Sequence, residues 1–83
     1  MWKLGVDVKT AQAARVIYAL GALPLVDSVE SLGVYPEDPG FSRLTVIADL
    51  TEDQLDAWCF KTQSIAQFIL GIWAIEEVGI CLE

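Results

Sequence analysis

The stretch from Ser28 to Leu55, SVESLGVYPEDPGFSRLTVIADLTEDQL, constrains the fold more than any other part of the chain. Two runs rich in apolar and β-branched residues flank a connection that contains Pro36, Pro39 and Gly40. Proline and glycine preset or permit the backbone angles of turns, whereas β-branched residues favour strands. The stretch therefore predicts two strands, the first over Val26–Tyr35, joined by a hairpin loop.

The second of these strands has a clear inner and outer face. Alternate residues are apolar, namely Leu44, Val46, Ala48 and Leu50. Side chains of successive strand residues point to opposite faces of a sheet. The even-numbered residues are therefore expected to face the core, with Ile47 as an apolar exception on the outer face.

A helix is predicted to begin directly after this strand. Thr51 and Gln54 have the spacing of a capping box, in which each side chain hydrogen-bonds the backbone amide of the other residue. The helical period then predicts one buried stripe, made of Leu55, Trp58, Cys59 and Thr62. Asp56 and Lys61 fall on the opposite face and are expected to be exposed.

The chain opens with another strand pattern, followed by a shorter helix. Apolar and polar residues alternate from Trp2 to Lys9. Thr10 is predicted to cap a helix over Ala11–Leu20, which is rich in good helix formers. One face of that helix is expected to carry Ala14, Ile17, Tyr18 and Gly21.

The segment Gln67–Ile75 has two interpretations because it is apolar on both alternating faces. A continued helix would be hydrophobic all round and would contain Gly71, at a cost of about 1 kcal/mol. A central strand accepts aromatic and β-branched residues on both faces, so the strand is favoured. Glu76 to Glu83 could add a short edge strand through Val78, Ile80 and Leu82.

The element order strand, helix, strand, strand, helix, strand predicts an α+β fold. It is typical of a ferredoxin-like sandwich, in which an antiparallel sheet carries two helices on one face, here within a single domain of residues 1–83. The other face of the sheet would be uncovered. It is predicted to present an apolar interaction surface made of Ile47, Ile69, Trp73 and Ile75.

The sequence ESLGVYPEDPGFSRLTVI, from Glu30 to Ile47, resembles the second and third strands of ACT domains, particularly those of acetohydroxyacid synthase regulatory subunits. The resemblance extends loosely through the second helix and into the Gln67 strand. It implies a regulatory module that pairs side by side and binds small ligands. The corresponding effector loop, Val8–Ala11, lacks the usual proline-glycine pair, so no specific binding of branched-chain amino acids is expected.

Charge and hydropathy narrow the possible partners. The formal charge of -7 comes without a basic cluster, which disfavours direct binding to nucleic acid. A hydrophobic fraction of 54% suggests a buried interface and hence a homodimer, although no apolar run reaches the roughly 18 residues of a membrane span. A second hypothesis is an acidic surface that imitates nucleic acid, formed by Glu37, Asp38, Glu52, Asp53 and Asp56. Small phage-encoded anti-restriction and anti-CRISPR proteins are similar in size and charge.

The only candidates for acid-base catalysis are the carboxylate pairs Glu37–Asp38 and Glu52–Asp53, which are expected in an exposed loop and in the first turn of a helix and not in a partly dry site. The chain has no histidine, and Cys59 and Cys81 stand alone, so zinc binding and Cys-His catalysis lack their components. Both thiols are expected to be buried. The sequence therefore predicts no enzyme, no catalytic residue, no metal and no cofactor.

Met1 leads straight into a strand pattern, from which a cytoplasmic protein is expected. A protein that binds and regulates a partner through its sheet is the favoured function.

Overall fold

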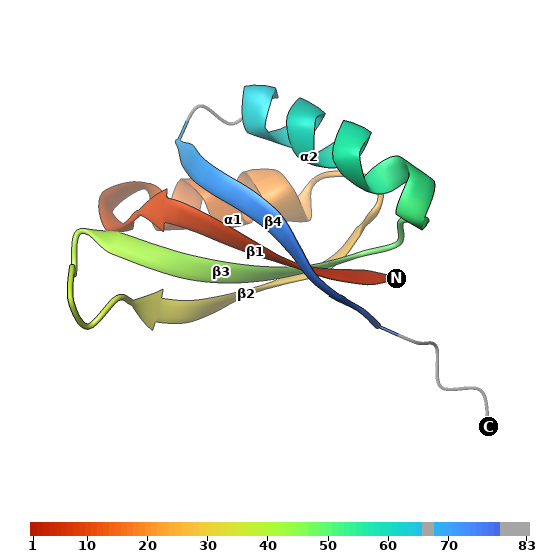
Figure 1. Cartoon of the computed structure of the whole chain (residues 1–83). Helices are drawn as coiled ribbons and strands as arrows, with labels where there is room; N and C mark the ends of the chain where they lie inside the picture. The colour runs from red at the N-terminus through yellow and green to blue at the C-terminus, as the bar shows by residue number, and fades with distance from the viewer. Residues whose placement is uncertain (66–67, 79–83) are drawn as a thin grey trace.

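The computed structural model describes residues 1–65 and 68–78. Its elements are β1 (Trp2–Lys9), a 3₁₀ turn η1 (Thr10–Gln12), α1 (Ala13–Gly21), β2 (Val26–Val34), β3 (Phe41–Ala48), α2 (Glu52–Ile65) and β4 (Ile69–Glu77) (Figure 1). The strands form one sheet in the order β2-β3-β1-β4, and all neighbouring pairs are antiparallel. This is the predicted ferredoxin-like βαββαβ arrangement.

Both helices cover the same face of the sheet, with α1 against β2 and α2 against β4 (Figure 1). The core lies between these two layers. Its largest fully buried side chains come from β1, β3 and α1: Leu4, Val6, Val8, Leu44, Val46, Val16 and Leu20. The alternation predicted from Trp2 to Lys9 and from Leu44 to Ala48 is therefore confirmed, because the even-numbered apolar residues of both strands are buried. The opposite face has no helix over it and is called the open face below.

The helix face predicted to carry Ala14, Ile17, Tyr18 and Gly21 is not the face that packs against the core. Val16 and Leu20 are buried, whereas Tyr18 is 82% exposed and Ala14 and Gly21 are also exposed. Of the predicted face, Ile17 alone is half-buried against the core. Val16 and Leu20 are four residues apart and so share a helix face, which packs against the core.

Thr10 does not cap α1, because the chain first makes the η1 turn and the helix begins at Ala13. The Thr10 hydroxyl instead donates to the Pro39 carbonyl oxygen at 2.8 Å and lies 2.8 Å from the Ser42 hydroxyl. The Thr10 backbone N–H donates to the Gly40 carbonyl oxygen. This threonine therefore ties the end of β1 to the β2–β3 hairpin.

The second helix follows its sequence pattern closely. Gln54 Oε1 accepts a hydrogen bond from the Thr51 backbone N–H at 2.9 Å, which is one half of the capping box. The Gln54 backbone N–H donates to the Thr51 carbonyl oxygen. The predicted stripe also holds, because Leu55 and Thr62 are buried and Trp58 and Cys59 are half-buried. Asp56 and Lys61 are exposed, as expected.

The last described element is a strand, β4, which decides between the two interpretations from Ile69 to Ile75, while Gln67 lies outside the described residues. Its pairing with β1 shifts register twice, leaving Leu70 and Ile75 as extra residues. The first shift brings Ile69 opposite Val8 and into the core, where Ile69 is 5% exposed. The prediction that Ile69 lies on the open face is therefore wrong, because a β-bulge reverses the alternation.

The strand continues to Glu77, and the Val78 backbone N–H donates to the Met1 carbonyl oxygen. Glu76 and Glu77 therefore belong to β4 and not to a separate edge strand. Ile80, Cys81 and Leu82 lie outside the described residues.

Candidate interaction surface

Cross-strand register arranges the open face in rows that run across the sheet, and three of these rows lie side by side beyond the pair Phe41 and Lys9. The first row contains Arg43, Asp7 and Gly71. The second contains Glu30, Thr45, Gly5 and Trp73. The third contains Ser28, Ile47, Lys3 and Glu76. Polar residues thus alternate with Trp73 and Ile47 on this face.

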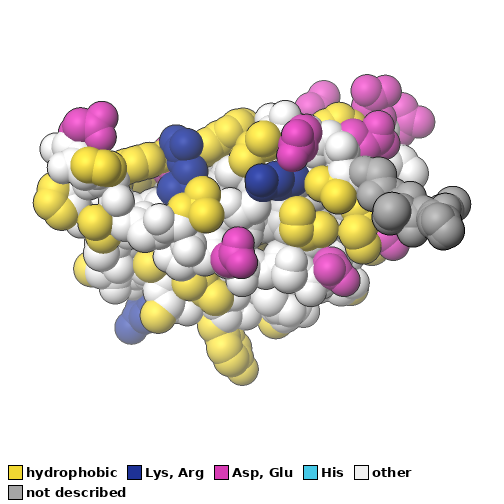
Figure 2. Space-filling view, turned by 90° about the horizontal axis from the view of Figure 1, so that it is seen from below, with side chains coloured by type: hydrophobic (Ala, Val, Ile, Leu, Met, Phe, Trp, Pro, Cys, Tyr) yellow, Lys and Arg dark blue, Asp and Glu magenta, His cyan; other side chains and the backbone are white. Residues whose placement is uncertain are grey.

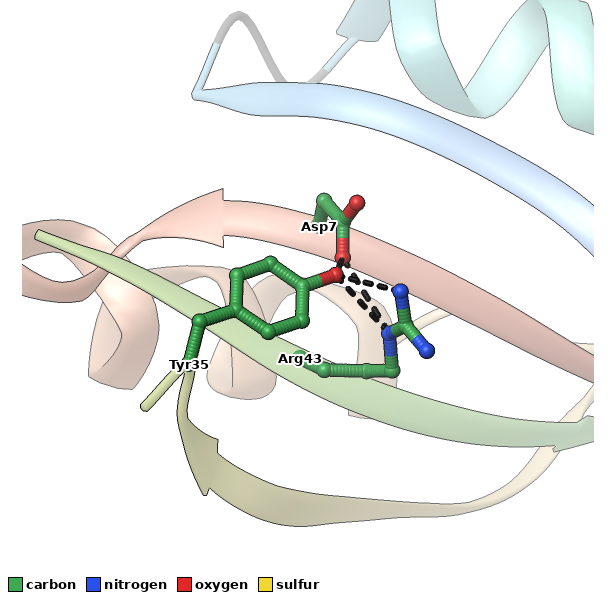
Figure 3. Close-up of polar contacts among 3 residues, drawn as sticks. All are labelled: Asp7, Tyr35 and Arg43. Carbon is green, nitrogen blue, oxygen red and sulfur yellow. Dashed lines mark hydrogen bonds and ion pairs between the residues drawn. The ribbon is translucent and has the colours of Figure 1, made fainter. Parts of the chain in front are cut away.

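A polar cluster occupies the first row and joins residues that are far apart in the sequence. The Tyr35 hydroxyl donates to Asp7 Oδ1, and Arg43 Nε donates to the Tyr35 oxygen at 2.9 Å (Figure 3). Arg43 Nε also lies 3.4 Å from Asp7 Oδ1 and forms an ion pair with it. Tyr35 follows β2, so three segments of the chain meet at one hydrogen-bonded group.

Trp73 extends this group into the second row. The Arg43 guanidinium carbon lies 4.9 Å from the ring centroid of Tyr35 and 4.9 Å from that of Trp73, within the range of cation–π contacts. The indole ring covers Gly5, where an added Cβ would lie 2.5 Å from Trp73 Cζ2. Glycine is therefore required beneath the ring. Tyr35, Arg43 and Trp73, with Asp7, are called the aromatic-arginine cluster below.

The environment of the cluster shifts two of its pKa values. Partial burial raises the pKa of Tyr35 above its ordinary 10.0, and the hydrogen bond to Asp7 raises it further. The pKa of Arg43 is also raised, chiefly by its hydrogen bond to Tyr35. The phenol therefore stays neutral and the guanidinium stays charged near neutral pH.

The predicted apolar surface is present only in part. Trp73 and Ile47 both lie on the open face but are not neighbours. Trp73 is in the second row on β4, whereas Ile47 is in the third row on β3, with β1 between the two strands. Ile75 is 45% exposed and sits at the second register shift, while Ile69 is in the core. Sequence reasoning missed Asp7, Tyr35 and Arg43. Asp7 and Arg43 occupy odd-numbered positions of β1 and β3, and the alternation of those strands already indicated that such positions face away from the core.

The predicted acidic residues fall into two separate groups. Glu37 and Asp38 lie in the β2–β3 loop at one end of the molecule, and Glu52, Asp53 and Asp56 lie at the start of α2 near the other end (Figure 1). All five are exposed, and the longest axis of the molecule is 40 Å. From below, acidic side chains occupy scattered positions with hydrophobic and basic ones between them (Figure 2). The two groups therefore do not form one continuous negative surface.

A hollow of about 440 Å³ lies on the open face beside Ile47. Residues from all four strands line it, including Ser28, Glu30, Thr45, Ile47, Lys3 and Glu76. Thr45 is only 6% exposed, and its hydroxyl has no hydrogen-bond partner among the described residues. This hollow was not predicted, because it depends on which side chains become neighbours across the strands.

The remaining candidates for chemistry lie away from the open face. Burial raises the pKa of the Cys59 thiol above its ordinary 9.0, with a smaller contribution from Asp56, so the thiol is protonated near neutral pH. Cys59 is half-buried, and Cys81 lies outside the described residues. Among residues 1–65 and 68–78, no cluster of three or more Cys, Asp or Glu side chains is placed to hold a metal ion. No described helix has the length and apolar character needed to cross a membrane.

The chain matches no protein-family model, and a search of curated proteins found no significant match.

Proposed function

We propose that this chain is a small non-enzymatic binding module that docks a partner protein on its open sheet face and regulates it. The observation that carries the proposal is the aromatic-arginine cluster on the face that no helix covers. Tyrosine, tryptophan and arginine are the residue types that dominate the binding energy of protein interfaces. Here Trp73, Arg43 and Tyr35 stack together before any partner arrives, so little side-chain entropy remains to be lost on binding.

The face supports docking better than the sheet edges do. β2 and β4 are the edge strands, and each shifts register twice against its neighbour. Such bulges interrupt the row of unpaired backbone groups that an added strand would need. A partner is therefore expected to contact side chains of the open face and not to extend the sheet.

A second copy of the chain is one possible occupant of this face. The module is small, and the exposed part of Trp73, together with Ile47, offers apolar area that a homodimer would bury. The alternative role, an acidic inhibitor that imitates nucleic acid, rests on the charge of -7. It has less support, because the two groups of carboxylates lie at opposite ends of the molecule.

The test begins by identifying a partner through affinity capture and mass spectrometry, and then measures its affinity for purified variants. Trp73→Ala should weaken binding about 30-fold or more, which corresponds to the ~2 kcal/mol of an interface hot spot. Gly5→Ala should weaken binding as well, because its new Cβ displaces the Trp73 ring without removing it.

Two matched controls separate docking from general damage to the protein. Gly71→Ala adds a Cβ to the same face where nothing lies within 4 Å, so it should leave the affinity nearly unchanged. Tyr18→Ala removes an aromatic ring that is 82% exposed on α1 and should also have little effect. If the affinity ignores Trp73→Ala but falls on replacing Glu37 and Asp38 by lysine, the docking proposal is wrong and the acidic alternative replaces it.

A further inference from the structure

The charges of the open face balance one another, although those of the whole protein do not. Six charged residues occupy paired positions on this face, namely Lys3, Lys9, Arg43, Asp7, Glu30 and Glu76. They comprise three of the five cations in the chain and only three of its twelve carboxylates. The face is therefore neutral, and the net charge of -7 comes from other parts of the chain.

A neutral face with charges of both signs suits a different partner from a uniformly charged one. A strongly basic or acidic protein gains little from it, because attraction to one sign is offset by repulsion from the other. A second copy of the chain carries the same mixture, so its cations can meet carboxylates. This face also lets two copies of an acidic protein approach with little repulsion between the surfaces that touch.

The strand order makes the face complementary to itself. The order is β2-β3-β1-β4, so a two-fold axis that runs along the strands, midway between β3 and β1, places β1 of each copy over β3 of the other. Within the first row, Arg43 then faces Asp7 of the second copy, and Asp7 faces its Arg43. Among the paired residues of the described strands, no row brings two like charges face to face.

Arg43 and Asp7 each keep a hydrogen-bonding atom for this contact. In Figure 3 the bonds of Asp7 all reach one oxygen, Oδ1, and those of Arg43 leave from Nε and Nη2. Asp7 Oδ2 and Arg43 Nη1 therefore have no partner among the described residues. The Asp7 side chain is 28% exposed and the Arg43 side chain 40% exposed, so a second copy can reach both.

The third row and Trp73 contribute in the same arrangement. Lys3 lies over Ile47 of the second copy, one strand and one row from its Glu30, and the two long side chains can span that separation. Trp73, on β4, lies over β2 of the second copy, where residues of β2 line the hollow. The polar and the apolar parts of the face therefore both meet a counterpart.

We propose that the occupant of the open face is a second copy of this chain, in a two-fold dimer held by the Arg43–Asp7 pairs and the Trp73 rings. The inference rests on the proposed docking role of the open face and names its occupant. Four strands of about eight residues span roughly 19 by 26 Å, so the two copies together would bury roughly 1,000 Å², near the lower end for a specific interface. The dimer is therefore expected to be reversible and not obligate.

An exchange of charges tests the dimer. Lys3→Glu leaves two surplus negative charges on the face, and Glu30→Lys leaves two surplus positive ones. Each variant alone should dimerise at least about tenfold more weakly than the wild type, because like charges then oppose one another. An equal mixture of the two should restore a mixed dimer, since each lysine then meets a glutamate. Sedimentation equilibrium with one of the two variants fluorescently labelled measures these affinities.

The matched control makes the same changes of charge on the helix layer. Asp56→Lys and Lys61→Glu are at exposed positions of α2, away from the open face. Their self-association should stay within about threefold of the wild type, and mixing them should add nothing. Circular dichroism checks that each variant is folded, and Lys9→Glu, at an exposed position of the open face, replaces Lys3→Glu if that variant is not. A control mixture that associates as well as the mixture with Glu30→Lys would overturn the proposal.

The outcome can be told apart from that of the docking proposal. A wild-type protein that stays monomeric at high micromolar concentration, or a mixture of Lys3→Glu and Glu30→Lys that assembles no better than its components, overturns the second copy as the occupant. If a captured partner still loses affinity for Trp73→Ala, docking stands with a different occupant. If the mixture assembles but the affinity of the captured partner ignores Trp73→Ala, the dimer stands and docking of that partner through the aromatic-arginine cluster fails.

Discussion

Tyr35 donates its phenolic proton to Asp7 and accepts from Arg43, so its ionisation reports directly on the cluster. We expect the phenol to titrate above pH 10.0, because burial and the bond to Asp7 both favour the neutral form. Ultraviolet absorbance of the phenolate measures this in a Tyr18→Phe background, where Tyr35 is the one remaining tyrosine. Asp7→Asn should lower the midpoint, whereas Arg43→Gln should raise it, because the guanidinium favours the phenolate.

The same shift makes stability depend on pH in a defined direction. The folded protein holds the Tyr35 proton more tightly than the unfolded chain does, so this contribution is complete below pH 10.0 and is lost as the pH rises through the folded pKa. Urea unfolding at increasing alkaline pH should therefore show a decline that is smaller in Tyr35→Phe. An identical decline in both proteins would mean that Tyr35 ionises equally well in the folded and unfolded states.

At the scale of the element, α2 depends on a local contact at its start. Gln54→Ala removes the acceptor of the Thr51 backbone N–H and should lower the free energy of unfolding by about 0.5 to 1 kcal/mol. Gln63→Ala, at an exposed position later in the same helix, should be neutral or slightly stabilising, since alanine is the better helix former. Urea denaturation of both variants measures the difference. Equal stabilities would show that the cap contributes nothing.

The strands show how one extra residue changes an element's role. Leu70 and Ile75 interrupt the pairing of β4 with β1, and the chain between them returns to regular alternation. Ile72 then lies opposite Val6 toward the core, while Trp73 lies opposite Gly5 on the open face. The first bulge therefore buries Ile69 without moving Trp73 off the open face.

At the scale of the whole molecule, the net charge gives self-association and partner binding opposite dependences on salt. Each copy carries -7, so a homodimer should form more tightly as salt screens the repulsion, whereas binding to a basic partner should weaken. Sedimentation over a range of salt concentrations measures the first of these. Trp73→Lys should leave a folded monomer, because Trp73 is only half-buried.

A wild-type protein that sediments as a strict monomer at high micromolar concentration and at every salt concentration would exclude the homodimer. Circular dichroism of Trp73→Lys is the control, because an unfolded variant would also lose the dimer without bearing on the face.

The sequence by itself determined those features whose causes are local. The alternation from Leu44 to Leu50, the stripe from Leu55 to Thr62 and the Gln54 cap all depend on residues within a few positions of one another. The order of the elements and the chirality of their connections then allow few topologies, which is why the ferredoxin-like arrangement could be predicted. The inner face of α1 was not predicted, because its short helix carries apolar residues on more than one side.

Only the tertiary structure decided how the strands pair. A single bulge at Leu70 moved Ile69 into the core, and no local pattern indicates where such a residue will be inserted. Asp7, Tyr35 and Arg43 meet because β1 pairs with β3 in one particular register, as do Glu30 and Thr45 across β2 and β3. Both candidate sites are made of side chains far apart in the sequence. Their geometry therefore depends on cross-strand pairing, which is set by the packing of the whole core.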